Sequence, residues 1–151
     1  MSSATPSPLD AFRLRHRLRV RWAEVDAQNI VFNGHYLTYF DIGITEYWRA
    51  IGLPYPDGVA GTGGDLFAVR SVVNYHASAH YDDLLDICVR AQRLGTSSMN
   101  FEMGIFRGDE RLISGEMIYV NADPAARRSL PLPDKLRQAI EGYESGAAIS
   151  A

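Results

Sequence analysis

The stretch NGHYLTYFDIGITEYWRAI, residues 33–51, decides the fold, because its large apolar residues recur with the period of an α-helix. These residues are three and four positions apart, so they form one stripe along one side of the helix. The stripe consists of Tyr36, Tyr39, Phe40, Gly43, Ile44, Tyr47, Trp48 and Ile51. Because the stripe is wide and aromatic, we expect this helix to pack across a sheet.

The ends of the helix and one interior glycine carry further signals. Asn33 is a residue type that favours the N-cap position, and Gly52 followed by Pro54 predicts the end of the helix. Gly43 weakens a helix interior by about 1 kcal/mol relative to alanine. We therefore expect the helix to approach a strand closely at Gly43.

Strands are predicted on both sides of the helix. From Arg13 to Trp22, arginine alternates with apolar residues or histidine, which is the period of a strand with one packed face. A loop over residues 123–133 and a short amphipathic helix over residues 133–143 end the pattern. Between the helix and this loop lie four β-rich runs, and the short turns between the runs imply antiparallel neighbours. The runs cover residues 65–80, 82–94, 97–107 and 110–121.

This order of elements predicts an α+β fold, in which an antiparallel sheet of about five strands wraps around one long central helix. The length of 151 residues, with 46% hydrophobic and 22% charged residues, fits one globular domain. We expect the domain to cover residues 13–145, between flexible tails at residues 1–12 and 146–151.

Composition also narrows the location and the partners. No apolar run approaches the roughly 18 residues that a membrane-spanning helix requires, and Met1–Asp10 lacks the apolar core of a signal peptide. We therefore expect a cytoplasmic protein without membrane insertion. The net charge of −3 gives no reason to expect nucleic acid as a partner.

The arginines between Arg13 and Arg21 and the single cysteine allow simple interpretations. The arginine row is either a solvated face that discourages pairing between sheet edges, or a set of contacts to the phosphates of a nucleotide-bearing substrate. Cys88 lies in an apolar run and is interpreted as a buried structural thiol. The histidines show no metal-ligand spacing, and one cysteine cannot form a zinc cluster, so we expect no metal.

The candidate for chemistry is Asp26, in the loop between the first strand and the long helix. A helix start presents unpaired backbone N–H groups and a partial positive charge, which can polarise a carbonyl and bind the oxyanion that forms on attack. A nearby ionised carboxylate can act as nucleophile or as base toward water. A thiolate leaves with little protonation, because thiols ionise near pH 8.5, at about the value for free cysteine. Such a site suits thioesters.

The residues around Asp26 resemble the active-site loop of the 4-hydroxybenzoyl-CoA thioesterase family, within the hotdog superfamily. The resemblance rests on Trp-Ala-Glu-Val-Asp at residues 22–26, Ile-Val-Phe-Asn at residues 30–33, and Tyr36. Later segments recur in that family in the same order, and the likeness covers about residues 15–136. These segments are residues 81–84, 93–101 and 116–121.

The resemblance implies a hotdog fold, a dimer joined by continuous sheets, and often a tetramer of two such dimers, with active sites at the subunit interface. Members of the family cleave acyl-CoA or acyl-carrier-protein thioesters without a metal or organic cofactor. The resemblance therefore implies a hydrolase of acyl-CoA metabolism that assembles as a homodimer or homotetramer.

The family's catalytic carboxylate matches Asp26. The backbone N–H groups of its oxyanion hole fall on the helix start, at Phe32, Asn33 and Gly34. His35 and Tyr36 follow in the first turn of the helix and are candidates for orienting the substrate. A related bacterial subgroup has histidine at the position of Asn33, so the acyl group is left open here.

Two other functions remain at this stage. One is a non-catalytic module that binds acyl thioesters. The other is a hotdog hydratase or dehydratase, whose paired Asp and His motif we do not find in this sequence. Within the thioesterase interpretation, Glu46 is a weaker candidate than Asp26, because it lies off the aromatic stripe.

Overall fold

The computed structural model describes residues 5–60 and 64–146, and the predictions for residues 1–4 and 147–151 lie outside this part of the chain. Its helices are α1 (His35–Ala50), α2 (Asp57–Ala60) and α3 (Asp134–Glu144), and 3-10 helices cover Leu9–Ala11 and Trp22–Glu24. Its strands are β1 (Leu14–Arg19), β2 (Asp65–Tyr75), β3 (Leu84–Leu94), β4 (Ser98–Arg107), β5 (Glu110–Asp123) and β6 (Arg128–Ser129). The long helix, the first strand, the four later strands and the C-terminal helix are therefore confirmed.

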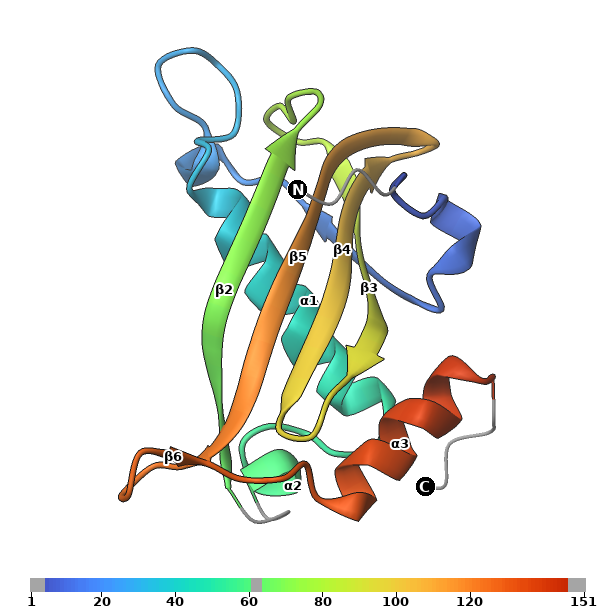
Figure 1. Cartoon of the computed structure of the whole chain (residues 1–151). Helices are drawn as coiled ribbons and strands as arrows, with labels where there is room; N and C mark the ends of the chain where they lie inside the picture. The colour runs from blue at the N-terminus through green and yellow to red at the C-terminus, as the bar shows by residue number, and fades with distance from the viewer. Residues whose placement is uncertain (1–4, 61–63, 147–151) are drawn as a thin grey trace.

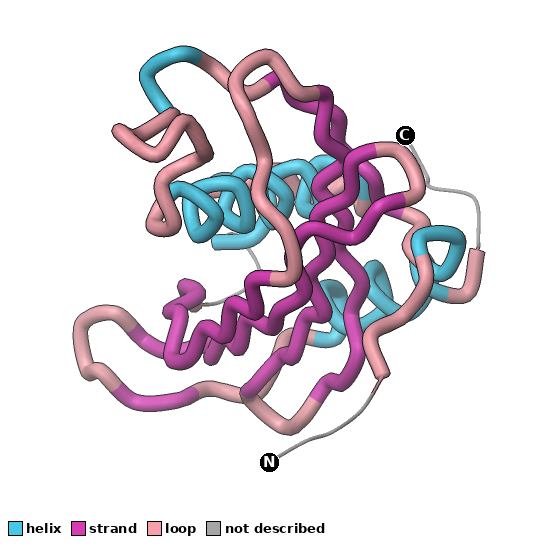
Figure 2. Tube along the Cα trace, turned by 90° about the horizontal axis from the view of Figure 1, so that it is seen from above, coloured by secondary structure: helices cyan, strands magenta, loops and turns pink. Residues whose placement is uncertain are grey.

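The strands form one antiparallel sheet in the order β1-β3-β4-β5-β2, and β6 pairs with β5. The sheet curves around α1, which lies across one of its faces (Figures 1 and 2). This arrangement is the predicted α+β hotdog fold. The sheet has one more strand than predicted, because the chain after Ala122 and Asp123 turns back and pairs with them through Arg128 and Ser129.

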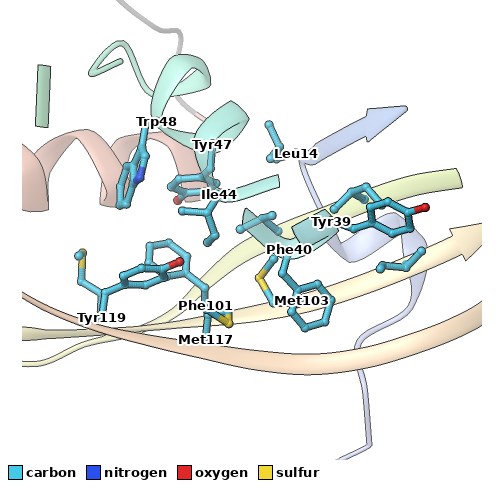
Figure 3. Packing of buried hydrophobic residues seen from close by; sticks show 14 of the residues in the cluster. Leu14, Tyr39, Phe40, Ile44, Tyr47, Trp48, Phe101, Met103, Met117 and Tyr119 are labelled. Carbon is cyan, nitrogen blue, oxygen red and sulfur yellow. The ribbon is translucent and has the colours of Figure 1, made fainter. Parts of the chain in front are cut away.

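The aromatic stripe of α1 forms the centre of the core. Its side chains are buried between the helix and the sheet, together with Phe101, Met103 and Met117 (Figure 3). A Cβ atom on Gly43 would lie 2.8 Å from Ile87 Cγ2 and 2.9 Å from Val89 Cγ2. The helix thus approaches β3 as closely as the glycine predicted.

The start of α1 differs from the prediction. Its N-cap is Gly34 rather than Asn33, and no side chain caps the helix by a hydrogen bond. The chain makes a turn first, because the His35 N–H donates to the Phe32 carbonyl at 2.9 Å. Asn33 therefore lies inside this turn, and its side chain is exposed rather than engaged as a cap.

Residues 5–12, expected to belong to a flexible tail, pack on the outer face of the sheet. The Ser7 N–H and hydroxyl each donate to the Glu102 carboxylate at 2.8 Å. Phe12 is buried against Cys88 and Phe106, because the outer face of β3 and β4 carries apolar groups that need a cover. Cys88 is fully buried, as predicted, and this burial raises the pKa of its thiol to about 12.

The helix α3 lies beside the sheet near the end of α1 (Figure 1). The Glu144 carboxylate accepts hydrogen bonds from the Tyr47 hydroxyl at 2.7 Å and from the Ala91 N–H at 2.8 Å. One carboxylate thereby joins three elements. No helix in the described part of the chain is long and apolar enough to cross a membrane.

Candidate active site

The loop between β1 and α1 folds back on itself, and Asp26 lies where its two arms pair. Val25 and Val31 form an isolated antiparallel bridge, and the Asp26 N–H donates to the Ile30 carbonyl at 3.0 Å. Asn29 completes the reversal in the left-handed region, with a φ of 62°. Asparagine tolerates this conformation better than most residues. Local sequence therefore shapes the loop that carries Asp26.

The Asp26 side chain has one engaged and one open oxygen. Oδ1 accepts a hydrogen bond from the Gln28 N–H at 2.8 Å, which is an Asx turn. This oxygen of Asp26 therefore has a structural role, because it stabilises the backbone of the loop. The other oxygen accepts no hydrogen bond from residues 5–60 or 64–146, so it is available to a substrate or a water molecule.

Glu24 fastens this loop to the helix. It is 7% exposed, and its carboxylate accepts hydrogen bonds from the Arg21 N–H at 2.8 Å, the Arg21 guanidinium at 3.0 Å and the Tyr39 hydroxyl at 2.9 Å. Its carbonyl accepts the Phe32 N–H at 2.9 Å. Glu24 therefore holds both stems of the loop, two residues before Asp26.

A cavity of about 280 Å³ lies beside this loop and brings several predicted residues together. Asp26, Asn33 and Tyr36 all line it. Phe32, Gly34 and His35 are not among its lining residues; Phe32 is 48% exposed, and its ring stacks edge-on against His35 at 5.6 Å. The remaining lining residues are Gln28, Ile30, Val31, Tyr75, His76, Ala77 and Ser78.

The amides at the helix start are not equivalent. The Phe32 N–H already donates to the Glu24 carbonyl. The N–H groups of Asn33 and Gly34 have no acceptor among the residues that the structure describes. Of the three predicted oxyanion donors, the geometry therefore leaves Asn33 and Gly34 free to bind a carbonyl oxygen, next to the positive end of α1.

The opposite wall of the cavity, Tyr75 to Ser78, was not predicted as part of the site. The run 65–80 was expected to be one strand, but β2 ends at Tyr75 because the N–H groups of His76 and Ala77 both donate to the Leu112 carbonyl. The chain then crosses toward the loop, where the Ala79 carbonyl accepts the Val31 N–H at 2.9 Å. The polar residues Asn74, His76 and Ser78 at the end of this run could have indicated that the strand ends before residue 80.

Tyr36 connects this wall to the helix. Its hydroxyl accepts the Ala79 N–H at 3.1 Å, and its ring packs edge-on against Tyr75 at 5.8 Å. Burial raises the pKa of the Tyr36 phenol, so it stays protonated and keeps a hydrogen to donate. The Tyr75 hydroxyl reaches the Asn33 carbonyl at 3.4 Å. The site is therefore a cleft between two segments that are far apart in sequence.

The other candidates lie away from this cleft. The arginines of β1 are exposed on the strand; Arg17 and Arg19 pair with Asp86 and Asp82 at 3.3 and 3.2 Å, and no arginine lines the cavity. Glu46 pairs with Arg49. The described residues contain no group of three or more His, Cys, Asp or Glu placed to hold a metal ion.

The arrangement can promote attack on a carbonyl carbon. Asp26, with one open carboxylate oxygen, and Asn33, with a free amide, line the same cavity, and the free amide of Gly34 follows Asn33 at the helix start. The carboxylate can therefore attack or activate water while the amides bind the developing oxyanion. Ile30, Val31, Tyr36 and Tyr75 give the cavity an apolar and aromatic lining.

Comparison with known proteins agrees with this chemistry. The chain matches the Thioesterase superfamily over residues 28–114, more than half of its length. The acyl-CoA thioester hydrolase YbgC of Escherichia coli is 26% identical over 124 residues, covering 81% of this chain and 91% of that protein. A thioesterase from Thermus thermophilus, solved with coenzyme A and Zn, is 26% identical with a TM-score of 0.79, covering 91% of this chain and 98% of the other. A 1,4-dihydroxy-2-naphthoyl-CoA thioesterase from Synechocystis shares the fold, with a TM-score of 0.76 at 17% identity, covering 84% of this chain and 94% of the other.

Proposed function

Because this chain belongs to the thioesterase superfamily and is a thioester hydrolase, we propose that it hydrolyses acyl-CoA thioesters to a free acid and a thiol with Asp26 as its catalytic carboxylate. One observation carries the proposal. Asp26, whose carboxylate keeps one open oxygen, lines the same cavity as Asn33, at the start of α1.

In the proposed reaction, the thioester carbonyl oxygen accepts hydrogen bonds from the Asn33 and Gly34 amides. Asp26 then either attacks the carbonyl carbon or removes a proton from an attacking water molecule. Both routes expel a thiolate, which needs little protonation. After direct attack, water hydrolyses the anhydride formed between the acyl group and Asp26, which releases the acid and restores the carboxylate. The amides lower the barrier because they already point at the oxyanion position and need no reorganisation when the charge develops.

The substrate class follows from the relatives. YbgC is named an acyl-CoA thioester hydrolase and the Synechocystis protein a 1,4-dihydroxy-2-naphthoyl-CoA thioesterase, so we propose coenzyme A as the carrier and acyl-carrier protein as the alternative. Tyr36 is the proposed orienting group for the acyl chain, because it lines the cavity and its hydroxyl retains a hydrogen. His35 is a weaker choice because it is not among the lining residues.

We also propose that two copies pair through β2. This strand has a neighbour on one side among the described residues, and its Phe67 and Val69 are 43% and 60% exposed. Exposed apolar residues on an unpaired edge favour pairing with a second chain. Since Tyr75 of β2 lines the cavity, the second copy would lie beside the site. A tetramer of two such dimers stays a prediction.

Light scattering on the purified protein tests this assembly, with Val69→Lys placing a charge on the edge. We expect a dimer for the wild type and a monomer with reduced turnover for the variant. Arg70→Lys, one residue further along the strand, is the control. A wild-type protein that is monomeric at all concentrations tested would remove the dimer.

Hydrolysis of a panel of acyl-CoA substrates, followed with a thiol-trapping reagent, tests the function. Asp26→Asn should lower kcat by about 100-fold to 10,000-fold, the usual effect of losing a general base or nucleophile. Asp109→Asn, in the exposed turn between β4 and β5, is the matched control and should retain full activity. Undiminished turnover in Asp26→Asn would exclude the mechanism.

A further inference from the structure

Arg107, the last residue of β4, binds four groups at once. Its Nη1 donates to the Ser78 carbonyl at 3.2 Å, to His80 Nδ1 at 3.3 Å and to Asp83 Oδ2 at 2.7 Å. Its Nη2 donates to Glu110 Oε1 at 2.7 Å. The planar guanidinium holds several acceptors in fixed directions, which a lysine ammonium on a flexible stem does not do.

One of these contacts reaches the wall of the cavity. Ser78 lines the cavity, and its carbonyl is the group that Arg107 binds. The next residue, Ala79, is fully buried and donates its N–H to the Tyr36 hydroxyl while accepting the Val31 N–H. A single peptide segment therefore connects Arg107 to the first turn of α1 and to the loop that carries Asp26.

The same segment is held at its far end by Asp83. The His80 N–H donates to Asp83 Oδ2 at 2.8 Å, and this oxygen also accepts from Arg107. The side chain of Arg107 is 29% exposed and that of Asp83 is 21% exposed, so water competes with this pair less than with a surface pair. The cluster lies outside the cavity, since neither Arg107 nor Asp83 lines it.

We infer that Arg107 is a positioning residue of the active site: it holds the segment from Ser78 to His80 so that Tyr36 and the Asp26 loop keep their reactive geometry. The inference rests on the proposed function. It does not make Arg107 a catalytic residue, because Arg107 acts through Ser78 and Ala79. Its effect belongs in the turnover step, since small displacements of reacting groups cost rate.

Two substitutions test this role, Arg107→Gln and Arg107→Lys. Both should lower kcat by at least about tenfold, with a smaller change in KM, because misplacing reacting groups by about 1 Å costs up to about 100-fold. Arg107→Lys retains the charge beside Asp83, so it keeps the fold if Arg107→Gln loses it. Glu110→Gln removes a partner of Arg107 away from the wall, and Arg17→Gln breaks an ion pair on β1; both controls should keep wild-type kcat.

Hydrogen exchange supplies a readout that does not depend on activity. The amides of Ala79 and Val31 should exchange faster in the Arg107 variants than in Glu110→Gln, because the wall segment opens more often. Wild-type kcat in Arg107→Lys, with unchanged exchange at these amides, would overturn the inference. If the wild type cleaves no thioester, the proposed function fails, and the exchange data alone then decide whether Arg107 holds the wall.

Discussion

The buried contact between Tyr39 and Glu24 should stabilise the loop of Asp26 by a measurable amount, and Tyr39→Phe removes it. The Tyr39 hydroxyl donates to Glu24 at 2.9 Å in the core. A hydrogen bond to a charged group contributes about 1.5–3 kcal/mol. Because Glu24 keeps its bonds from Arg21, we expect a loss at the lower end, about 1.5 kcal/mol in the free energy of unfolding.

Urea denaturation at neutral pH measures this loss, and Tyr81→Phe is the matched control. Tyr81 is 52% exposed, and its hydroxyl makes no hydrogen bond with the described residues. The control should therefore stay within about 0.5 kcal/mol of the wild type. If Tyr39→Phe were as stable as Tyr81→Phe, the contact would not hold the loop and our reasoning would fail.

The same variant makes a prediction about pH. Burial alone would raise the pKa of Glu24, but hydrogen bonds from Arg21 and Tyr39 and the Arg21 charge bring it below its usual value. A lowered carboxyl pKa contributes stability above the unfolded value of about 4.3, and this contribution disappears as pH falls through the folded pKa. The difference in the free energy of unfolding between wild type and Tyr39→Phe should therefore become smaller below about pH 4. A gap that stays constant into strong acid would contradict this explanation.

Two further predictions concern packing. Gly43→Ala should lower the free energy of unfolding by about 1 kcal/mol, because overpacking against Ile87 and Val89 costs more than the gain in helix propensity. Gly142→Ala in α3 should raise the free energy of unfolding by up to about 1 kcal/mol, because a Cβ atom added there would meet no atom within 4 Å. Opposite signs in urea denaturation are the expected result, and equal signs would contradict the packing. Cys88 should resist a thiol reagent in the native protein and react once unfolded, since its thiol is fully buried; fast labelling without urea would disprove this.

Local patterns were sufficient for most of the fold. The period of the stripe in residues 33–51 predicted α1, and the alternation before it predicted β1. The contact of Gly43 with β3, now confirmed, was predicted because glycine is a poor helix former inside a helical pattern. Fine details were less predictable. The N-cap of the helix is Gly34, one residue later than the predicted Asn33, because the His35 N–H donates to the Phe32 carbonyl and forms a turn before the helix.

Half of the candidate site was also predictable. Asp26, Asn33 and Tyr36 belong to one continuous stretch, so their neighbourhood is set by the loop and the first helical turn. The wall from Tyr75 to Ser78 was missed because a strand pattern does not record where the chain leaves the sheet. The engagement of the Phe32 N–H was missed for a similar reason, since it depends on how the loop closes on Glu24.

The sequence by itself determined the α+β class, the central helix and the placing of a carboxylate at a strand–helix junction, because these depend on periodicity and on residues close along the chain. Tertiary structure alone decided what faces that carboxylate. Ala79 meets Tyr36 across 43 positions, and Ser7 meets Glu102 across 95. Contacts of this range form when the sheet curls around the helix, and no local pattern encodes which distant backbone groups then become partners.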